Sequence, residues 1–375
     1  AISEFKEWSY HVFNITFHLV VVVLVYRLGK LIVSHMYVGT TSLVKAPTQM
    51  PLLAASIFAV HPLNTQAVTY ISSRSSVMAT IFYLITVILF FEGLYKEKDE
   101  VTKTNYVFVV GAAVFFGLGF LCKLIVVSLP AILFAYHYYF ISNHNLQTWV
   151  KKQWKWVVGV GGILFSTFLL TKIYGDGLLR ASIVDVTTWE YFRTQLGVIP
   201  LEYFRKMLFP FNLTIDTNFQ VVKHWRSIVV IGGLIILGVF YVVWLKLSQV
   251  KKQSKKYGPE AFGLIWVLIT LSPTSSFIPL LDMAAEHRTY LPLVGYSIFL
   301  SSLLIRLKSF IKKSIEIGTS GICSNKKMLR VSVVIILVIL ASFLVGTRER
   351  NKVWKDEISL WADAKQKAPF LIRPY

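Results

Sequence analysis

Three ionisable residues stand side by side in the stretch PLLDMAAEHRTYLPLVGY, between two apolar segments: Glu286, His287 and Arg288. A charge inside a bilayer is costly, so ionisable groups beside apolar spans usually mark a pathway or a binding site. Arginine offers a planar fork for phosphate oxygens, and lysine offers a point charge. Two further lone cations, Arg74 and Lys123, fit the same chemistry. Together these residues predict a site for an anionic headgroup whose tail stays in lipid.

The elements that must position these residues are apolar blocks. Of the 375 residues, 55% are hydrophobic, and they come in long runs rather than at amphipathic spacing. This pattern predicts an all-α, polytopic membrane protein of about ten helices. The predicted spans are 10–33, 49–61, 77–95, 106–122, 124–141, 155–171, 227–245, 261–281, 289–305 and 331–346. The block 49–61 is too short to cross unaided, so a buried or re-entrant helix stays open there.

The net charge of +20 would indicate nucleic acid as the partner of a soluble protein. Here the membrane topology explains much of it, because loops rich in Lys and Arg alternate with loops that hold one basic residue each. The rich loops are predicted to be cytoplasmic. The lone cations Arg74, Lys123 and Arg288 then all fall on the opposite, outer face, and no nucleic-acid partner is expected.

Two segments outside the spans are long enough to fold by themselves. In the segment 172–226, apolar and charged residues alternate as in an interfacial amphipathic helix pair, interrupted at Pro200. In the tail 347–375, Trp354 and Trp361 share one helical face. We therefore divide the chain into a transmembrane domain, 1–346, and the start of a helical, repeat-like region, 347–375.

Other polar positions carry weaker signals. His61 and Pro62 end an apolar helix, and His11, Asn14 and His18 share one helix face, where polar side chains usually bond neighbouring helices. Glu286 is expected to pair with Arg288 or Arg74. The two cysteines fall on opposite faces, and no CxxC pair indicates a metal site.

Four stretches resemble, in this order, the membrane core of the transmembrane and tetratricopeptide-repeat-containing O-mannosyltransferases: HPLNTQAVTYISSRSSVMATIFYL, FLCKLIVVSLP, LSPTSSFIPLLDMAAEHRTYLPLVGY and RNKVWKDEISLWADAKQKAP. The wording TQAVTYI is most similar to the bacterial relatives. The resemblance implies a GT-C superfamily fold with its active site on the outer face. It also implies a polyprenyl-phosphate sugar as donor, transfer to Ser or Thr hydroxyls of proteins, and tetratricopeptide repeats after the membrane part, through which further proteins can bind.

The resemblance also implies roles for particular residues. Arg288, Lys123 and Arg74 are assigned to the donor phosphate. Hydrogen bonds to phosphate or sugar are assigned to His287, His61 and Tyr290. The matched positions with a structural role are Tyr10, Pro62, Pro292, His11, Asn14 and His18.

The catalytic base is less well placed by the resemblance. Glu286 most simply orients Arg288, although it is the best candidate for a base within the chain. The superfamily's main acid lies in the loop after its first span, and we expect that loop to precede Ala1. Where relatives place Glu after the lysine, this chain has Leu124.

The sequence thus predicts a membrane glycosyltransferase with a lipid-linked, mannose-like donor, a protein acceptor and membrane lipids around it. No resident cofactor is indicated, and a divalent cation stays open. A bacterial inner membrane with the site facing the periplasm is favoured, with the endoplasmic reticulum and its lumen as the alternative. Two other functions would carry the same cations: a transporter or flippase for a lipid-linked or anionic solute, and a noncatalytic membrane anchor for a repeat scaffold.

Overall fold

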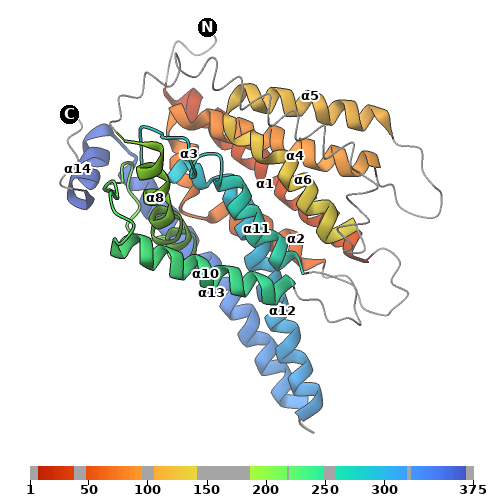
Figure 1. The fold of residues 1–375 in the computed structure, drawn as a ribbon. Helices are drawn as coiled ribbons and strands as arrows, with labels where there is room; N and C mark the ends of the chain where they lie inside the picture. The colour runs from red at the N-terminus through yellow and green to blue at the C-terminus, as the bar shows by residue number, and fades with distance from the viewer. Residues whose placement is uncertain are drawn as a thin grey trace.

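The computed structural model describes residues 7–37, 48–94, 105–141, 186–217, 219–248, 258–318 and 322–368. The regular elements in these ranges are helices (Figure 1). Five stretches are long and apolar enough to cross a membrane: Trp8–Met36, Ile71–Gly93, Leu124–Ile141, Ile228–Ser248 and Arg330–Val353. The prediction of an all-α fold is therefore confirmed for the described residues. Five of the predicted spans coincide with stretches that could cross a membrane by length and composition, and the predicted span 155–171 lies outside the described residues.

The first half of the molecule is a layer of apolar helices. It contains α1 (Glu7–Tyr37), α2 (Gln49–Val60), α4 (Arg74–Leu94), α5 (Tyr106–Cys122) and α6 (Leu129–Tyr136). Helix α1 packs against α2 and α4, and α4 packs along α5. Two short pieces, α3 (Asn64–Thr69) and η1 (Ile71–Ser73), connect α2 to α4. The helix α6 is flanked by the 3₁₀ turn η2 (Leu124–Ser128) and the π turn η3 (His137–Ile141).

The second half packs against this layer, chiefly through α12 on α2 and α11 on α6. It contains α8 (Thr188–Val198), α10 (Ile228–Ser248), α11 (Pro259–Leu271), α12 (Pro292–Gly318), α13 (Ile322–Val353) and α14 (Glu357–Lys367). Helix α12 packs against α11, α2 and α13. The pair α12 and α13 extends beyond the rest of the molecule at one end, and α14 lies near the opposite end (Figure 1).

A proline changes the helix at the interfacial segment without ending it. Pro200 lacks the amide hydrogen that would bond to the carbonyl of Leu196, and its ring would clash with that carbonyl in an α-helix. After α8 the chain widens into the π turn η4 (Ile199–Phe204) and then continues as α9 (Arg205–Leu208). The predicted interruption at Pro200 is therefore a wider turn within a continuous run of helix.

One predicted span is too long. Helix α11 ends at Leu271, whereas the sequence predicted helix to residue 281. Pro273 lacks the amide hydrogen that would bond to the carbonyl of Ile269, and the Ser272 hydroxyl donates to that carbonyl instead at 2.8 Å. The following stretch to Ala285 is irregular, with turns and bends. This irregular stretch leads into the Glu286, His287 and Arg288 turn.

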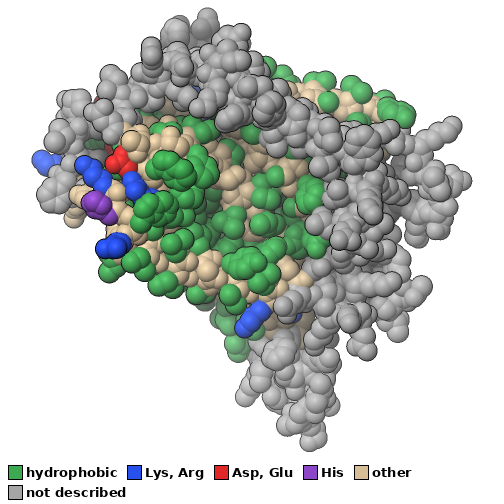
Figure 2. All heavy atoms as spheres, in the orientation of Figure 1, with side chains coloured by type: hydrophobic (Ala, Val, Ile, Leu, Met, Phe, Trp, Pro, Cys, Tyr) green, Lys and Arg blue, Asp and Glu red, His purple; other side chains and the backbone are tan. Residues whose placement is uncertain are grey.

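Aromatic rings fill the core between the two halves. Trp266 of α11 and Tyr83 of α4 are fully buried with ring centroids 5.6 Å apart, and Tyr136 of α6 stacks on Phe91 at 4.0 Å. By contrast, only 11% of the span in α10 is buried. In Figure 2 hydrophobic side chains cover the middle of the visible face, and charged side chains gather at the edge beside α8. An apolar face of this kind is expected to contact lipid.

Candidate functional site

The site is built on a single turn, the 3₁₀ element η5 (Glu286–Thr289), which Pro292 follows as the first residue of α12. The Thr289 hydroxyl closes the turn by donating to the Glu286 carbonyl at 2.6 Å. The backbone N–H of His287 donates to the side-chain oxygen of Gln66 at 2.6 Å, which ties the turn to α3. Proline at the first helical position suits α12, because no intrahelical partner exists there for its missing N–H.

Two cations, Lys123 and Arg288, and the ring of His287 form a group at this turn, which we call the cation cluster. The charge of Arg288 acts on Lys123, and both charges act on His287. Lys123 caps α5 and donates to the Ser76 hydroxyl at 2.6 Å. Burial, followed by the charge of Arg288, lowers the pKa of Lys123 to about 8. Burial, followed by the two cations, lowers the pKa of His287 to about 3, so its imidazole is neutral at physiological pH.

Arg288 keeps an unused donor in a buried position. Arg288 is only 6% exposed, and its Nη2 donates to the carbonyl of Asp282 at 2.8 Å. Burial alone would lower the pKa of Arg288, but Tyr203, Tyr191 and Asp282 raise it above its usual value, so the guanidinium stays charged. Nη1 of Arg288 and Nδ1 of His287 are among the buried side-chain atoms that have no hydrogen-bond partner within the described residues. A bound anion would satisfy the Arg288 donor.

Arg74 contacts an aromatic ring. It begins α4, two residues before the Ser76 that binds Lys123. Its guanidinium lies over the ring of Tyr10, 5.0 Å from the centroid, which is a cation–π contact. The structure therefore brings Lys123, His287 and Arg288 together and places Arg74 on the helix that carries the Lys123 partner.

The carboxylate of Glu286 faces away from the cation cluster. Its Oε1 accepts from Lys206 Nζ at 3.1 Å and from the backbone N–H of Thr214 at 2.8 Å, and its Oε2 lies 3.8 Å from Arg350. The residue is 3% exposed. The expected partners of Glu286 were Arg288 and Arg74, and the basic residues it contacts are Lys206 and Arg350. Its function in the structure is to hold the turn.

His61 has both ring nitrogens in use. Nε2 lies 3.1 Å from the Met207 carbonyl, and Nδ1 accepts from the backbone N–H of Leu63 at 3.3 Å. This pattern requires the neutral tautomer with the proton on Nε2. Burial lowers the pKa of His61 to about 4, in agreement with a neutral ring. These contacts join α2 to the end of α9, and they leave His61 a structural role.

The other predicted motif residues bond helices to each other. Nδ1 of His18 accepts from the Tyr290 hydroxyl at 2.8 Å, and its Nε2 lies 3.3 Å from the Ala59 carbonyl. The Asn14 amide donates to the Val68 carbonyl at 3.0 Å. Pro62 packs closely against Gly346 of α13, where an added Cβ would lie 2.9 Å from the proline ring. His11 is partly exposed on the same helix as Asn14 and His18.

Sequence reasoning singled out none of the residues that hold the turn through their side chains: Gln66, Glu202, Lys206 and Arg350. Lys206 and Glu202 form an ion pair at 2.9 Å, and their i, i+4 spacing in an amphipathic segment was the available signal. Gln66 and Arg350 lie within the stretches that carry the resemblance, but the sequence did not show that they contact η5, because each is far from it along the chain. Within the described residues, no group of three or more His, Cys, Asp or Glu is placed to hold a metal ion.

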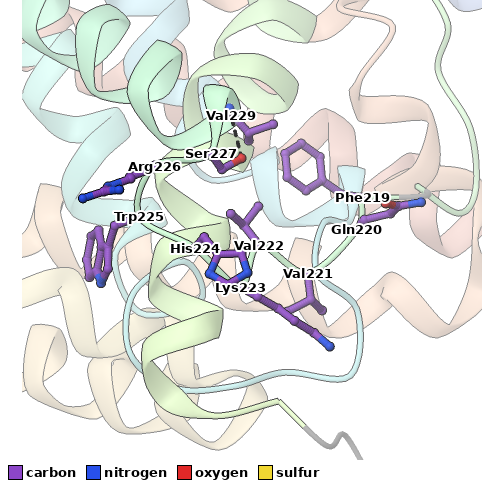
Figure 3. A pocket seen from close by; sticks show the side chains of 10 residues that line it. All are labelled: Phe219, Gln220, Val221, Val222, Lys223, His224, Trp225, Arg226, Ser227 and Val229. Atoms are coloured by element: carbon purple, nitrogen blue, oxygen red, sulfur yellow. Dashed lines mark hydrogen bonds between the residues drawn. The ribbon is translucent and has the colours of Figure 1, made fainter.

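A cavity of about 1050 Å³ lies elsewhere, along the chain from Phe219 to Val229 (Figure 3). Its lining includes the basic residues Lys223, His224 and Arg226. In the figure the side chains of Trp225 and Arg226 point to one side and Lys223 to the other. These basic groups diverge, so the cavity lacks the convergent cations that distinguish the η5 cluster.

The fold has five helical stretches long and apolar enough to cross a membrane, as in a polytopic membrane protein, and basic residues are buried at the η5 turn. By sequence the chain is a distant homologue of the protein O-mannosyl-transferases. It is 23% identical to protein O-mannosyl-transferase TMTC3 of Homo sapiens over 97% of the chain and 39% of that protein. It is 22% identical to TMTC4 of Mus musculus over 97% of the chain and 51% of that protein.

A third relative, protein O-mannosyl-transferase F38B6.6 of Caenorhabditis elegans, is 21% identical over 98% of the chain and 47% of that protein. The chain thus spans about 39% to 51% of the length of these curated relatives. No family model matches the chain, and no solved structure matches it. The relationship is therefore one of family, at low identity.

Proposed function

We propose that the protein is a membrane glycosyltransferase of the GT-C type. It moves a mannose-like sugar from a polyprenyl-phosphate donor to Ser or Thr hydroxyls of proteins on the outer face of the membrane. The observation that carries the proposal is the buried cluster of Lys123, His287 and Arg288 with an unsatisfied Arg288 donor. The near full-length relationship to protein O-mannosyl-transferases supports the same reaction class.

In the proposed reaction the bond between the anomeric carbon and the phosphate oxygen breaks, and a bond from that carbon to the acceptor hydroxyl forms. Negative charge develops on the departing polyprenyl phosphate, and fixed cations aimed at such charge are often the largest catalytic contribution. Arg288 and Lys123 supply these cations, with Arg74 as a third, and His287 donates or accepts at the phosphate or sugar.

The hydroxyl proton must pass to a base. Glu286 is engaged by Lys206, Thr214 and Arg350, so we assign it the support of the turn. We therefore propose that the base is a carboxylate other than Glu286.

The proposal is tested with Arg288→Ala in lipid nanodiscs, by transfer of radiolabelled mannose from polyprenyl-phosphate mannose to a Ser- and Thr-containing peptide. Loss of an electrostatic contact of this kind is expected to lower kcat about 100-fold or more. Arg348→Ala is the matched control, because Arg348 is exposed on α13, and it should retain wild-type activity.

Transfer by Arg288→Ala at the wild-type rate would remove the phosphate role. Wild-type protein that binds the donor but moves no sugar, while the lipid crosses the bilayer, would favour the flippase. Melting curves of both variants exclude misfolding as the cause.

A further inference from the structure

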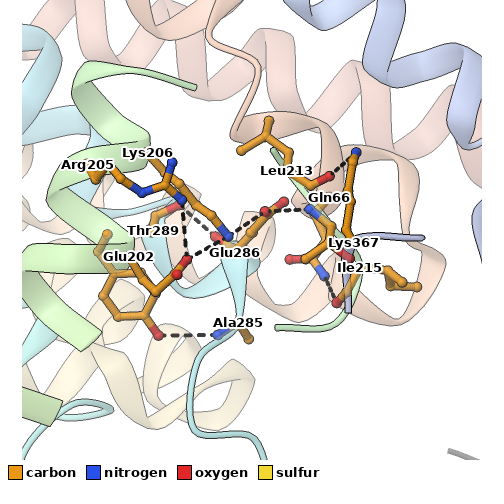
Figure 4. A network of polar contacts seen from close by, with 12 residues as sticks. Gln66, Glu202, Arg205, Lys206, Leu213, Ile215, Ala285, Glu286, Thr289 and Lys367 are labelled. Carbon is orange, nitrogen blue, oxygen red and sulfur yellow. Dashed lines mark hydrogen bonds and ion pairs between the residues drawn. The ribbon is translucent and has the colours of Figure 1, made fainter. Parts of the chain in front are cut away.

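Six charged residues form a chain that runs from the interfacial segment to the last described helix. In order they alternate in sign: Glu202, Lys206, Glu286, Arg350, Asp363 and Lys367. The successive N–O distances are 2.9, 3.1, 3.8, 3.0 and 2.6 Å. Three acids balance three bases, so the chain is neutral overall. Figure 4 shows the Glu202, Lys206 and Glu286 part of it.

The middle of this chain is buried. The side chains of Lys206, Glu286 and Arg350 are only 3–4% exposed. Burial alone would lower the pKa of Lys206, but Glu286 and Glu202 outweigh it and raise the pKa, so the ammonium stays charged. A buried charge that loses its partner is strongly destabilising, so such a chain holds one arrangement of its members. Glu286 is therefore fixed by charges that come from α9 and α13.

A second connection joins the same two regions through the backbone. Leu213, Thr214 and Ile215 are consecutive, and each binds a different partner. Lys367 donates to the Leu213 carbonyl at 2.8 Å, the Thr214 N–H donates to Glu286, and Gln66 donates to the Ile215 carbonyl at 2.9 Å. Figure 4 shows Lys367 reaching this strip of chain opposite Glu286. Gln66 in turn accepts from the His287 N–H.

Both connections begin on α14 and end on η5. Asp363 is the branching point on α14, because it pairs with Arg350 of the charge chain and with Lys367 of the backbone connection. Arg350 also lies over the ring of Trp354, 5.7 Å from its centroid, and that ring meets Tyr70 at 6.0 Å. The helix after the last span is thus fastened to the turn that carries His287 and Arg288.

We propose that α14 positions the donor-phosphate site, with Asp363, Arg350 and Lys367 as the positioning residues that set η5. The inference rests on the proposed function, because the group being positioned is the donor-binding Arg288. The residues act through Glu286 and the 213–215 strip, and they do not touch the reacting atoms. A small displacement of Arg288 would weaken its contact with the donor phosphate and lower the rate of transfer by a large factor. A helix that does not touch the donor can therefore still control how well this site binds it.

The test compares Asp363→Asn with Glu357→Gln, a matched loss of one carboxylate from an exposed position on the same helix. Full-length protein in nanodiscs is assayed for the KM of the polyprenyl-phosphate mannose donor and for kcat. We expect Asp363→Asn to raise the donor KM about tenfold and Asp363→Glu to restore it. Glu357→Gln should leave the donor KM unchanged. Lys367→Gln, at a more exposed position, should raise the KM by a smaller factor because Asp363 keeps its ion pair with Arg350 and only the contacts of Lys367 with Asp363 and Leu213 are lost.

Hydrogen exchange measured by mass spectrometry over residues 282–292 gives a readout that needs no turnover. Exchange of the η5 amides should be faster in Asp363→Asn than in Glu357→Gln. An unchanged donor KM in Asp363→Asn, or a loss of kcat that only follows the folded fraction, would overturn the positioning role. Absence of any transfer by the wild-type protein would instead overturn the proposed function, so the two failures are distinct.

Discussion

Burial decides which groups around η5 are charged. Lys123, His287 and Arg288 lie together, yet they respond differently because a guanidinium keeps its proton where an imidazole loses it. The result is a site with one permanent cation, one cation of lowered pKa and one neutral ring. A phosphate diester or monoester suits this combination, because it supplies the negative charge that the cluster lacks.

The lowered pKa of Lys123 predicts a pH dependence. With a pKa of about 8, Lys123 is mostly protonated below pH 8 and loses its charge as the pH rises through that value. The donor KM should therefore rise between pH 7 and pH 9, by up to about tenfold if the ammonium contributes one charge-assisted hydrogen bond.

Lys123→Arg provides the control for this profile, since arginine stays charged throughout the range. The variant should bind the donor with a KM that does not change between pH 7 and pH 9. A wild-type KM that is flat over the same range, measured in the same nanodiscs, would show that Lys123 does not hold the phosphate.

Residue types predicted the cluster but not the direction of each side chain. The adjacency of Glu286 and Arg288 favoured an ion pair, yet a 3₁₀ turn sends the two side chains to different neighbours: Glu286 to Lys206 and Arg350, and Arg288 to Asp282. The partners come from segments that are distant in sequence. Only the tertiary structure could supply Lys206, Arg350 and Gln66.

At the scale of elements, the crossing of α8 and α10 depends on two glycines. A Cβ on Gly233 would meet the carbonyl oxygen of Leu196, and one on Gly197 would meet the side chain of Val229. The Leu196 carbonyl is the one that Pro200 deprives of its usual amide partner. The close crossing therefore lies directly before the π turn η4. Because α9 follows η4 without a break, the crossing also helps to position Lys206 of α9.

Gly233→Ala is predicted to destabilise this crossing. The added methyl group meets backbone, which cannot rotate away, and overpacking of this kind costs about 1–3 kcal/mol. Gly232→Ala is the neighbouring control, because nothing lies within 4 Å of its Cβ position. Thermal unfolding in nanodiscs should show a lower Tm for Gly233→Ala and an unchanged or higher Tm for Gly232→Ala. Equal Tm values would show that the helices are not in close contact.

Element ends were the least predictable part of the fold. Hydropathy averaged over 261–281 predicted helix to residue 281, but the polar stretch SPTSS at 272–276 interrupts the apolar run and Pro273 cannot continue the helix, so α11 ends at Leu271. The proline rule predicted that the helix would break at Pro200. The helix instead continues through a π turn, at a place where α8 packs closely against α10. The long spans were predictable because a continuous apolar run of 18 or more residues indicates a membrane helix whatever the helix propensity of its single residues.

The whole molecule has two ends, one that carries the candidate site and one that lies away from it. The η5 turn, the start of α4 and the helix α14 gather at one end, and the distal ends of α12 and α13 lie at the other (Figure 1). Of the basic residues on α12, Arg306 and Lys308 lie toward the second end, and the positive-inside rule assigns a basic end to the cytoplasm. The proposed reaction requires the first end to face the outer compartment.

This orientation predicts the labelling of two engineered cysteines, Glu357→Cys on α14 and Ser309→Cys on α12, both at exposed positions. Each is placed in a background in which Cys122 and Cys323 are replaced by serine. A membrane-impermeant maleimide applied to the outer side should label position 357 in intact membranes and position 309 only after permeabilisation. The reverse result would place Arg288 and Lys123 on the cytoplasmic side, where a site for acceptors of the outer compartment could not operate.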